Sequence, residues 1–246
     1  MDAIRIKKEL IRQKKSKFKG NIYHFSQVSF AYNSNKIEGS RLTEDQTEAI
    51  FDTQSIISKS ENLIKLDDLI EVKNHFKLFD YILDSIDEIL TEDMILKMHK
   101  MLKRGTSDED SPLYNVGGFK KVPNIIGLQN VIETSSPENV RNDLEELLID
   151  YEKLQEVTLK DIIDFHVRFE RIHPLSDGNG RIGRLIMFKE CLKNNIVPFI
   201  ILDEEKAFYM RGLKEYNKDR KYLKDTILHF QDIYDEMCNR LLNYDV

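Results

Sequence analysis

The segment from His173 to Arg184 constrains the fold of this chain more than any other part of the sequence. It reads HPLSDGNGRIGR and separates two stretches in which apolar residues recur at helical spacing. Thr158 and Asp161 are placed to cap the start of the first stretch, and Pro174 disfavours helical geometry at His173, where that stretch ends. The segment therefore predicts two helices joined by a tight turn that contains glycine.

Most of the remaining chain also has a helical pattern. Thr43 followed by Gln46 is typical of a capping box, and Gly39 is placed to end the helix before it. Pro137 favours the first position of another helix. The helices are expected over residues 26–38, 65–90, 92–104, 137–154, 204–216 and 222–242. Between Asp108 and Gln129 glycines and prolines interrupt the pattern, so the chain is predicted to be mainly α with one short β-hairpin.

Composition excludes several classes of protein. With 246 residues and 41% hydrophobic residues, the chain can bury the core of one domain or of one domain with an extension. A formal charge of -6 is the wrong sign for binding nucleic-acid phosphates, and no apolar stretch is long enough to span a membrane. Cys191 and Cys238 lie outside any Cys/His cluster, so neither a disulfide framework nor a zinc site is expected.

These features favour a cytoplasmic protein with no nucleic-acid partner and no membrane partner. The first twenty residues are basic, and a solvated helix is the expected structure for them, with a targeting or anionic-lipid role as the alternative.

The turn between the two central helices gathers groups that bind phosphate. Glycines at 178 and 180 let successive backbone N–H groups converge, and the helix that follows adds the positive end of its dipole. Arg181 and Arg184 are three positions apart on that helix, so both side chains can face one polyanion. The turn is thus a candidate phosphate site.

Two further residues of the segment supply reactive groups. Asp177 is a hard oxygen ligand suited to Mg²⁺, and His173 can accept a proton near pH 7. The segment thus contains a base, a metal ligand, an anion site and two cations within twelve residues. This set fits nucleotidyl transfer, because that reaction must neutralise charge at the phosphorus while a hydroxyl loses its proton.

Other interpretations of the segment are weaker. A calcium loop needs glycine and glutamate where this chain has Ile182 and Phe188. A P-loop needs Lys-Ser/Thr after its glycines, and a dinucleotide fingerprint needs a preceding strand. A plain helix–turn–helix connection with a surface histidine is the structural alternative. His166 and Glu170 precede His173 on the same helix, and a hydrogen-bonded core histidine is expected there rather than a metal site.

The segment resembles the signature of the Fic family, His-x-Phe-x-Asp/Glu-Gly-Asn-Gly-Arg-x-x-Arg. Every polar position matches, and Leu175 replaces the usual phenylalanine. The resemblance covers about residues 91–235 and implies a mainly α Fic-type fold with a short β-hairpin flap. It also implies a protein adenylyltransferase, which uses ATP as co-substrate with Mg²⁺ and transfers AMP to a Ser, Thr or Tyr hydroxyl of a target protein. Self-modification and a homo-oligomer stay open.

The resemblance assigns a role to each residue of the signature. His173 would be the general base and Asp177 the metal ligand; the residues that would bind ATP are Gly178, Asn179 and Gly180 as the anion hole, with Arg181 and Arg184 on the β- and γ-phosphates. Tyr209 would line an adenine pocket, with ordinary core packing as the alternative.

The resemblance also assigns a role to the hairpin. Ile125 and Ile126 would lie in the flap that aligns the target chain by strand addition, with an ordinary surface hairpin as the alternative. Lys120 stands where the family more often has arginine.

A second motif lies far upstream. Ser34-Asn-Lys-Ile-Glu38-Gly39 resembles the family's inhibitory motif, Ser/Thr-x-x-x-Glu-Gly/Asn. Ser34 and Glu38 share one face of a helix, and the Glu38 carboxylate would pair with Arg184 and take the cation that should hold the γ-phosphate. Residues 1–90 would form an N-terminal helical region carrying this inhibitory helix, and residues 91–246 the catalytic core with the C-terminal helices.

Three alternative functions stay open. One is a hydrolase that removes AMP from a modified protein, with Glu38 orienting the water. Another is a relative that transfers a different phosphate-bearing group, against which the intact Gly-Asn-Gly-Arg stretch argues. The last is an inactive binding or antitoxin-like module, against which the intact His173, Asp177 and both arginines argue.

Overall fold

The computed structural model describes residues 2–16, 18–56, 63–126 and 132–244, which form ten α-helices, one 3-10 helix and two short strands. The helices are α1 (Ala3–Ser16), α2 (Ile22–Ile37), α3 (Glu44–Thr53), α4 (Leu66–Asp84), α5 (Glu92–Lys103), α6 (Val140–Glu152), α7 (Leu159–Ile172), α8 (Asn179–Lys193), α9 (Lys206–Glu215) and α10 (Arg220–Tyr244), with the 3-10 helix η1 (Asp203–Glu205) before α9. None of these helices is both long and apolar enough to cross a lipid bilayer.

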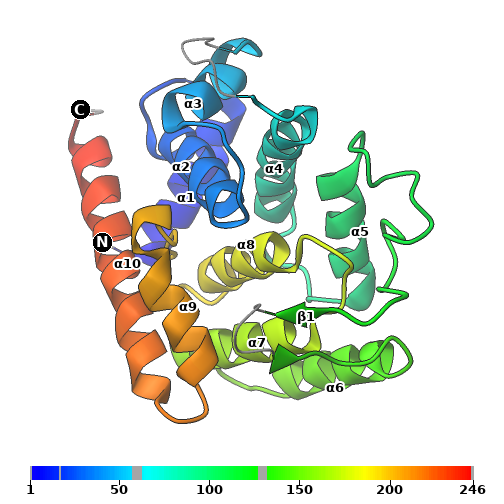
Figure 1. Ribbon diagram of the computed structural model, residues 1–246. Coiled ribbons are helices and arrows are strands. Elements are labelled where there is room, and N and C mark those ends of the chain that lie inside the picture. The colour runs from blue at the N-terminus through cyan, green and yellow to red at the C-terminus, as the bar shows by residue number, and fades with distance from the viewer. Residues whose placement is uncertain (1, 17, 57–62, 127–131, 245–246) are drawn as a thin grey trace.

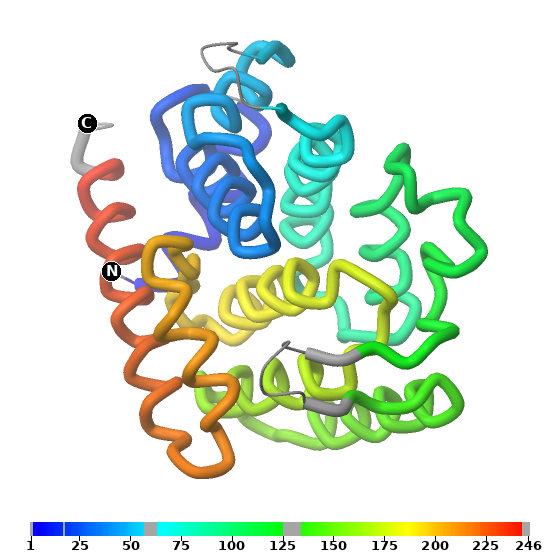
Figure 2. Tube along the Cα trace, in the orientation of Figure 1, coloured from blue at the N-terminus to red at the C-terminus, as the bar shows by residue number. Residues whose placement is uncertain are grey.

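Helix α8 lies at the centre of the fold (Figure 1). Helices α2 and α4 lie on one side of it, α7 with α6 on the other, and α5 beside the turn that leads into α8. Helices α9 and α10 form an outer hairpin, seen as the orange and red tubes in Figure 2. Almost every side chain of α8 is buried, including Ile182, Leu185 and Phe188, because neighbouring helices cover it on all sides.

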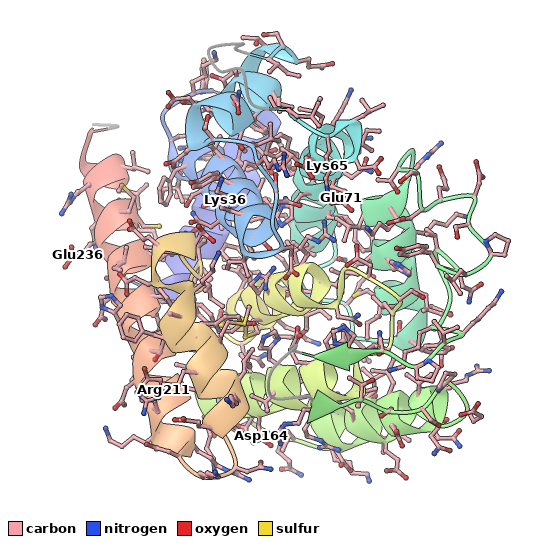
Figure 3. The ribbon with its side chains drawn as sticks, in the orientation of Figure 1. Lys36, Lys65, Glu71, Asp164, Arg211 and Glu236 are labelled. Atoms are coloured by element: carbon pink, nitrogen blue, oxygen red, sulfur yellow. The ribbon has the colours of Figure 1, made fainter. Side chains whose placement is uncertain are left out.

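Aromatic side chains from four helices meet around Phe188. Its ring centroid lies 5.4 Å from that of Phe30 on α2, 5.2 Å from Phe79 on α4 and 5.7 Å from Tyr234 on α10. Charged side chains such as Arg211 and Glu236 instead extend from the outer faces of α9 and α10 (Figure 3). One apolar core therefore contains side chains from residues 1–90 and from residues 91–246. The division of the chain into an N-terminal region and a catalytic core at residue 90 stays a prediction.

Local helix signals in the sequence are confirmed. Thr43 and Gln46 form the capping box, with N–H donations of 3.0 Å to Gln46 Oε1 and 3.2 Å to Thr43 Oγ1. Thr158 and Asp161 form a second capping box at the start of α7. Gly39 follows the end of α2 with a φ of +96°, a conformation that glycine adopts without strain.

Two sequence-based predictions of helix ends were wrong. Helix α4 ends at Asp84, because the chain turns at Ser85, whose hydroxyl donates to the Tyr81 carbonyl at 2.8 Å. Helix α6 begins at Val140 rather than at Pro137, because residues 137–139 form a turn. The basic N-terminal segment forms a helix, as expected, and its basic side chains are exposed or half-buried, while its apolar side chains pack into the core, with Ile6 fully buried.

The expected hairpin corresponds to two strands of two residues each. Strand β1 (Ile125–Ile126) pairs antiparallel with β2 (Ile132–Glu133), with Ile126 opposite Ile132. The turn between them, residues 127–131, lies outside the described residues. A role for this pair as a flap that docks a target chain stays a prediction.

The aromatic cluster predicts a large stability effect at its centre. Phe188→Ala should lower the free energy of unfolding by about 3–5 kcal/mol, because it leaves a cavity among three rings. Phe18→Ala is the matched control, since the Phe18 side chain is 73% exposed and its loss should change the free energy by less than about 0.5 kcal/mol. Urea unfolding followed by circular dichroism measures both, and similar midpoints for the two variants would contradict the packing role of Phe188.

Candidate active site

The turn between α7 and α8 has a backbone shape that two residues set. His173 ends α7 with a φ of +52°, and its N–H donates to the Phe169 carbonyl at 2.9 Å. Gly178 precedes α8 with a φ of +83°, and a Cβ there would lie 2.8 Å from Leu102 Cδ2. Glycine is therefore required at 178 both for the backbone conformation and for the close approach of α5.

Asn179 holds the turn closed from inside. Its Oδ1 accepts from the Leu175 N–H at 2.9 Å, and its Nδ2 donates to the Leu175 carbonyl at 2.8 Å. Leu175 itself is fully buried in the core, where an apolar side chain fits in place of phenylalanine. Because the Asn179 side chain is used in this way, an anion at the turn would be bound by the backbone N–H groups of the first turn of α8.

His173 is set up to accept a proton at Nε2. Its Nδ1 lies 3.2 Å from the Glu170 carbonyl oxygen, and a carbonyl only accepts, so Nδ1 carries the proton. Nε2 of the neutral ring then presents a lone pair. Burial lowers the pKa of His173, which keeps the imidazole neutral and basic at pH 7.

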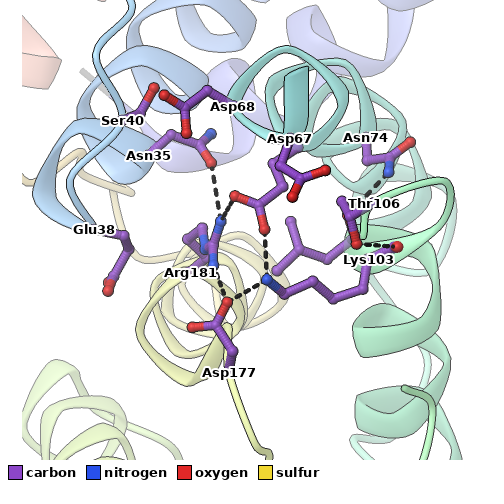
Figure 4. A network of polar contacts seen from close by, with 12 residues as sticks. Asn35, Glu38, Ser40, Asp67, Asp68, Asn74, Lys103, Thr106, Asp177 and Arg181 are labelled. Atoms are coloured by element: carbon purple, nitrogen blue, oxygen red, sulfur yellow. Dashed lines mark hydrogen bonds and ion pairs between the residues drawn. The ribbon is translucent and has the colours of Figure 1, made fainter. Parts of the chain in front are cut away.

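Asp177 lies between two cations. Its Oδ2 accepts from Arg181 Nη2 at 2.9 Å and pairs with the Lys103 ammonium (Figure 4). Although burial acts to raise the pKa of Asp177, the charges of Arg181 and Lys103 lower it far below the usual value. Glu71 and Asp108 lie close by, and one carboxylate oxygen from each of the three acids falls within 4.8 Å of the others. This set of hard oxygen donors fits a Mg²⁺ ion.

Arg181 is buried among acidic and polar side chains. It donates from Nη1 to Glu71, which Figure 3 marks on α4, and from Nη2 to Asp177. Asn35 Oδ1 lies 3.4 Å from the same Nη1. The guanidinium group is therefore held by residues of α2, of α4 and of the turn before α8.

The structure brings Ser34, Glu38 and Arg184 together. Arg184 donates from Nε to Ser34 Oγ at 3.0 Å, and from Nη2 to the Ser34 carbonyl at 2.9 Å and Glu38 Oε1 at 2.7 Å. A Cβ at Gly180 would overlap Glu38 Oε1, so the carboxylate occupies the space that this glycine leaves. The end of α2 thus covers the first turn of α8, and an inhibitory role for this contact stays a prediction.

Tyr209 lies in the core behind Arg184. Its side chain is 1% exposed, and its hydroxyl lies 2.6 Å from His166 Nε2, so the expected hydrogen-bonded core histidine is confirmed. A role for Tyr209 in binding adenine stays a prediction. Glu170 is also buried here, and burial raises the pKa of its carboxyl to about 8.

Lys120 connects the base of the hairpin to the end of α7. Its buried ammonium donates to Asn124 Oδ1 and Thr134 Oγ1, both at 2.8 Å, and to the Ile172 carbonyl at 3.2 Å. These contacts fix the approach to β1 beside His173. The roles of Ile125 and Ile126 stay predictions, because the description covers only their backbone.

Sequence reasoning missed three residues of the site, Glu71, Lys103 and Asp108. Lys103 contacts Glu71 from 32 positions away, and Glu71 contacts Arg181 across 110 positions. In its own sequence segment each looks like an ordinary charged residue. Its place in the site can be recognised only when the packing of α4, α5 and α8 is known.

Comparison with known proteins agrees with this fold and turn. Residues 89–191 match the Fic/DOC family. A probable protein adenylyltransferase of Aquifex aeolicus is 30% identical over 133 residues, which are 52% of this chain and 38% of that protein. Protein adenylyltransferase Fic of Nematostella vectensis is 24% identical over 188 residues, which are 76% of this chain and 42% of that protein.

Solved structures show the same fold. A Fic domain containing signaling protein from Bacteroides thetaiotaomicron superposes with a TM-score of 0.74 at 22% identity, covering 95% of this chain and 94% of that one. Fic-1 from Caenorhabditis elegans, residues 134–508 with the E274G substitution, gives 0.72 at 20% identity and covers 98% of this chain and 72% of that one.

The chain has a mainly helical Fic-type fold, and its residues 89–191 match the Fic/DOC family. More particularly, it is a distant homologue of proteins named protein adenylyltransferases, and it spans about two fifths of the length of the curated relatives it matches.

Glu170 predicts a pH dependence of stability. Its pKa is raised from 4.5 to about 8, so the folded state favours the protonated form. The contribution of Glu170 is complete below pH 4.5 and is lost as pH rises through about 8. Between these limits it should lower the free energy of unfolding by up to about 1.4 kcal/mol per pH unit.

Urea unfolding from pH 5 to 8 tests this dependence. Residue 170 cannot ionise in Glu170→Gln, so this variant should lose the contribution of Glu170 to the slope of the unfolding free energy against pH. Glu145→Gln, at an exposed position on α6, should keep the wild-type slope. The same slope in Glu170→Gln and wild type would mean that Glu170 ionises in the folded protein as it does in water.

Proposed function

We propose that this protein is a protein adenylyltransferase that moves AMP from ATP to a hydroxyl side chain of a target protein. One arrangement carries the proposal: His173, whose Nε2 is free of the ring proton, ends α7 at the turn that leads into α8, and Arg181 and Arg184 are buried in the first two turns of α8. His173 is close enough to Asp177 and Glu38 for both charges to influence its pKa. The names of the homologues support the same activity.

The arrangement suits an in-line displacement at the α-phosphorus of ATP. The target hydroxyl oxygen bonds to that phosphorus while His173 Nε2 accepts its proton, and the bond to the β-phosphate breaks to release pyrophosphate. The backbone N–H groups at the start of α8 stabilise the phosphate oxygens, and Arg181 and Arg184 balance the charge of the leaving pyrophosphate. Lys120 keeps the hairpin beside His173, where an extended segment of the target would pair with it.

Mg²⁺ fits this site through Asp177. The Asp177 carboxylate stays ionised, and its oxygens are the ligand type that Mg²⁺ prefers. When bound, the ion would neutralise charge on the phosphates of ATP. Asp177 would hold the ion, and Arg181, which is fixed to Asp177, would keep that carboxylate oriented.

We also propose that Glu38 inhibits the transfer. Arg184 donates to Glu38 and Ser34 from the two nitrogens Nε and Nη2, so these donors are already used and a γ-phosphate would have to compete for them. Arg184 is desolvated, with its side chain 2% exposed, whereas the Glu38 side chain keeps 31% of its surface in contact with solvent. ATP would have to displace the Glu38 carboxylate from Arg184 before binding productively.

Removing the Glu38 carboxylate should activate the protein. Glu38→Gly frees Arg184, and AMP transfer, including self-modification, should rise about 10–100-fold at low ATP, the range expected if Glu38 occupies Arg184 about 99% of the time. Incorporation from α-labelled and γ-labelled ATP, measured in parallel, reports this rise. Label from the α position identifies AMP transfer, whereas label from the γ position would identify a kinase and contradict the proposal.

Two controls separate competition for Arg184 from a loosened N-terminal helix. Glu156→Gly, at an exposed position in the loop before α7, should leave incorporation unchanged. Arg184→Ala should not activate, because it removes the phosphate ligand together with the partner of Glu38. Equal incorporation by wild type and Glu38→Gly would mean that Glu38 does not inhibit.

His173 should be essential for the transfer. In the Glu38→Gly background, His173→Ala should reduce the rate of AMP incorporation by about 10²–10⁴-fold, the usual contribution of a general base. ATP binding measured by calorimetry should persist, because other groups hold the phosphates. His229→Ala, at an exposed histidine of α10, is the control expected to keep the full rate. An unchanged rate in His173→Ala would rule out His173 as the base.

A further inference from the structure

A buried lysine holds the acidic corner of the candidate site together. The Nζ of Lys103, at the end of α5, lies 2.5 Å from Glu71 Oε1 and 2.8 Å from Asp108 Oδ2, and it also pairs with Asp177 Oδ2 (Figure 4). Its side chain is 3% exposed. The three carboxylates therefore replace the water shell of this ammonium group.

The three acids surround Lys103 as oxygen ligands surround a metal ion. Glu71 comes from α4, Asp108 from the segment after α5, and Asp177 from the turn before α8. One oxygen of each lies within 4.8 Å of the others, and Nζ contacts all three residues. Lys103 thus fills the position in which a cation would be bound by all three carboxylates.

The local charge favours a cation at this position. Three half-buried carboxylates face two buried cations, Lys103 and Arg181, which leaves one negative charge in the cluster. Without Lys103 the same cluster would hold three negative charges against Arg181 alone. A carboxylate cluster with that excess binds a divalent cation or becomes protonated.

We propose that Lys103 is a built-in cation that holds Asp177 in the nucleotide-free protein and must leave Asp177 before Mg²⁺ can bind there. The inference rests on the proposed adenylyl transfer, which supplies the reason for a metal at Asp177. After leaving Asp177, Lys103 stays paired with Glu71 and Asp108, so no buried charge loses all its partners. Lys103 is thus a positioning residue that makes metal binding depend on the nucleotide, whose phosphate oxygens supply further ligands.

The test measures metal binding in the absence of nucleotide. Mn²⁺ is the probe, and the electron paramagnetic resonance signal of free Mn²⁺ gives the affinity. Lys103→Met should bind one Mn²⁺ at least about 10-fold more tightly than wild type, because the ammonium no longer competes for the carboxylates. Lys100→Met, at an exposed position one turn earlier on α5, should bind as weakly as wild type.

A double variant locates the ion that Lys103→Met gains. Adding Asp177→Asn to Lys103→Met should abolish the gain, because it removes one of the three carboxylates. Equal Mn²⁺ affinity in Lys103→Met and wild type would overturn the inference. The inference would also be overturned if the wild-type protein bound Mn²⁺ tightly without nucleotide and Asp177→Asn abolished that binding. This holds for any result with the Lys103 variants.

Folding of the variant does not limit the test. If Lys103→Met is unstable without metal, its thermal midpoint should recover with Mn²⁺ more than that of Lys100→Met, and the absence of such recovery would also count against Lys103. The measurement needs no target protein and no turnover. A gain of Mn²⁺ binding in a protein that transfers no AMP would refute the proposed function and keep the Lys103 site, whereas transfer without the gain would refute the Lys103 inference alone.

Discussion

The burial of two guanidinium groups on one helix is the constraint on which the rest of the structure depends. Arg181 and Arg184 are both 3% exposed, and neither can remain charged inside the protein without anionic or polar partners. Asp177 in the preceding turn is one partner of Arg181, and the others come from the N-terminal half of the chain: Glu71 on α4 for Arg181, and Ser34 with Glu38 at the end of α2 for Arg184. Helices α2 and α4 are thereby fixed against α8 by charge as well as by the aromatic core.

The same requirement links the two proposals made for the site. A phosphate group and a carboxylate are alternative partners for a buried guanidinium, and a metal ion and an ammonium are alternative partners for a buried carboxylate. In this chain the Glu38 carboxylate takes the place of a phosphate at Arg184, and the Lys103 ammonium takes the place of a metal ion at Asp177. Asp177, Arg181 and Arg184 are therefore all paired within the protein, and on the proposed function the binding of Mg²⁺ with ATP would be an exchange of these partners.

Much of the fold could be predicted from sequence, because its strongest signals are local. The two capping boxes, the turn before α8 and the pairing of Ser34 with Glu38 on one helix face depend on residues within a few positions of each other. The end of α4 was missed because a turn at Ser85 outweighs the apolar pattern that continues beyond it. Glu71 and Lys103 were missed because only the packing of helices that are distant in sequence brings them to the site. The contact of Glu38 with Arg184 was expected only because Ser34 to Gly39 resembles a family motif.

The position of Glu38 has a consequence for how the contact with Arg184 is lost. Glu38 directly follows the last residue of α2, and its N–H donates to the Asn35 carbonyl at 3.1 Å. Gly39, with its positive φ, comes next. The middle of α2, by contrast, is anchored through Phe30 in the aromatic core. Unwinding of the last helical turn alone would withdraw the carboxylate, so release requires local fraying of a helix end and no movement of α2 as a body.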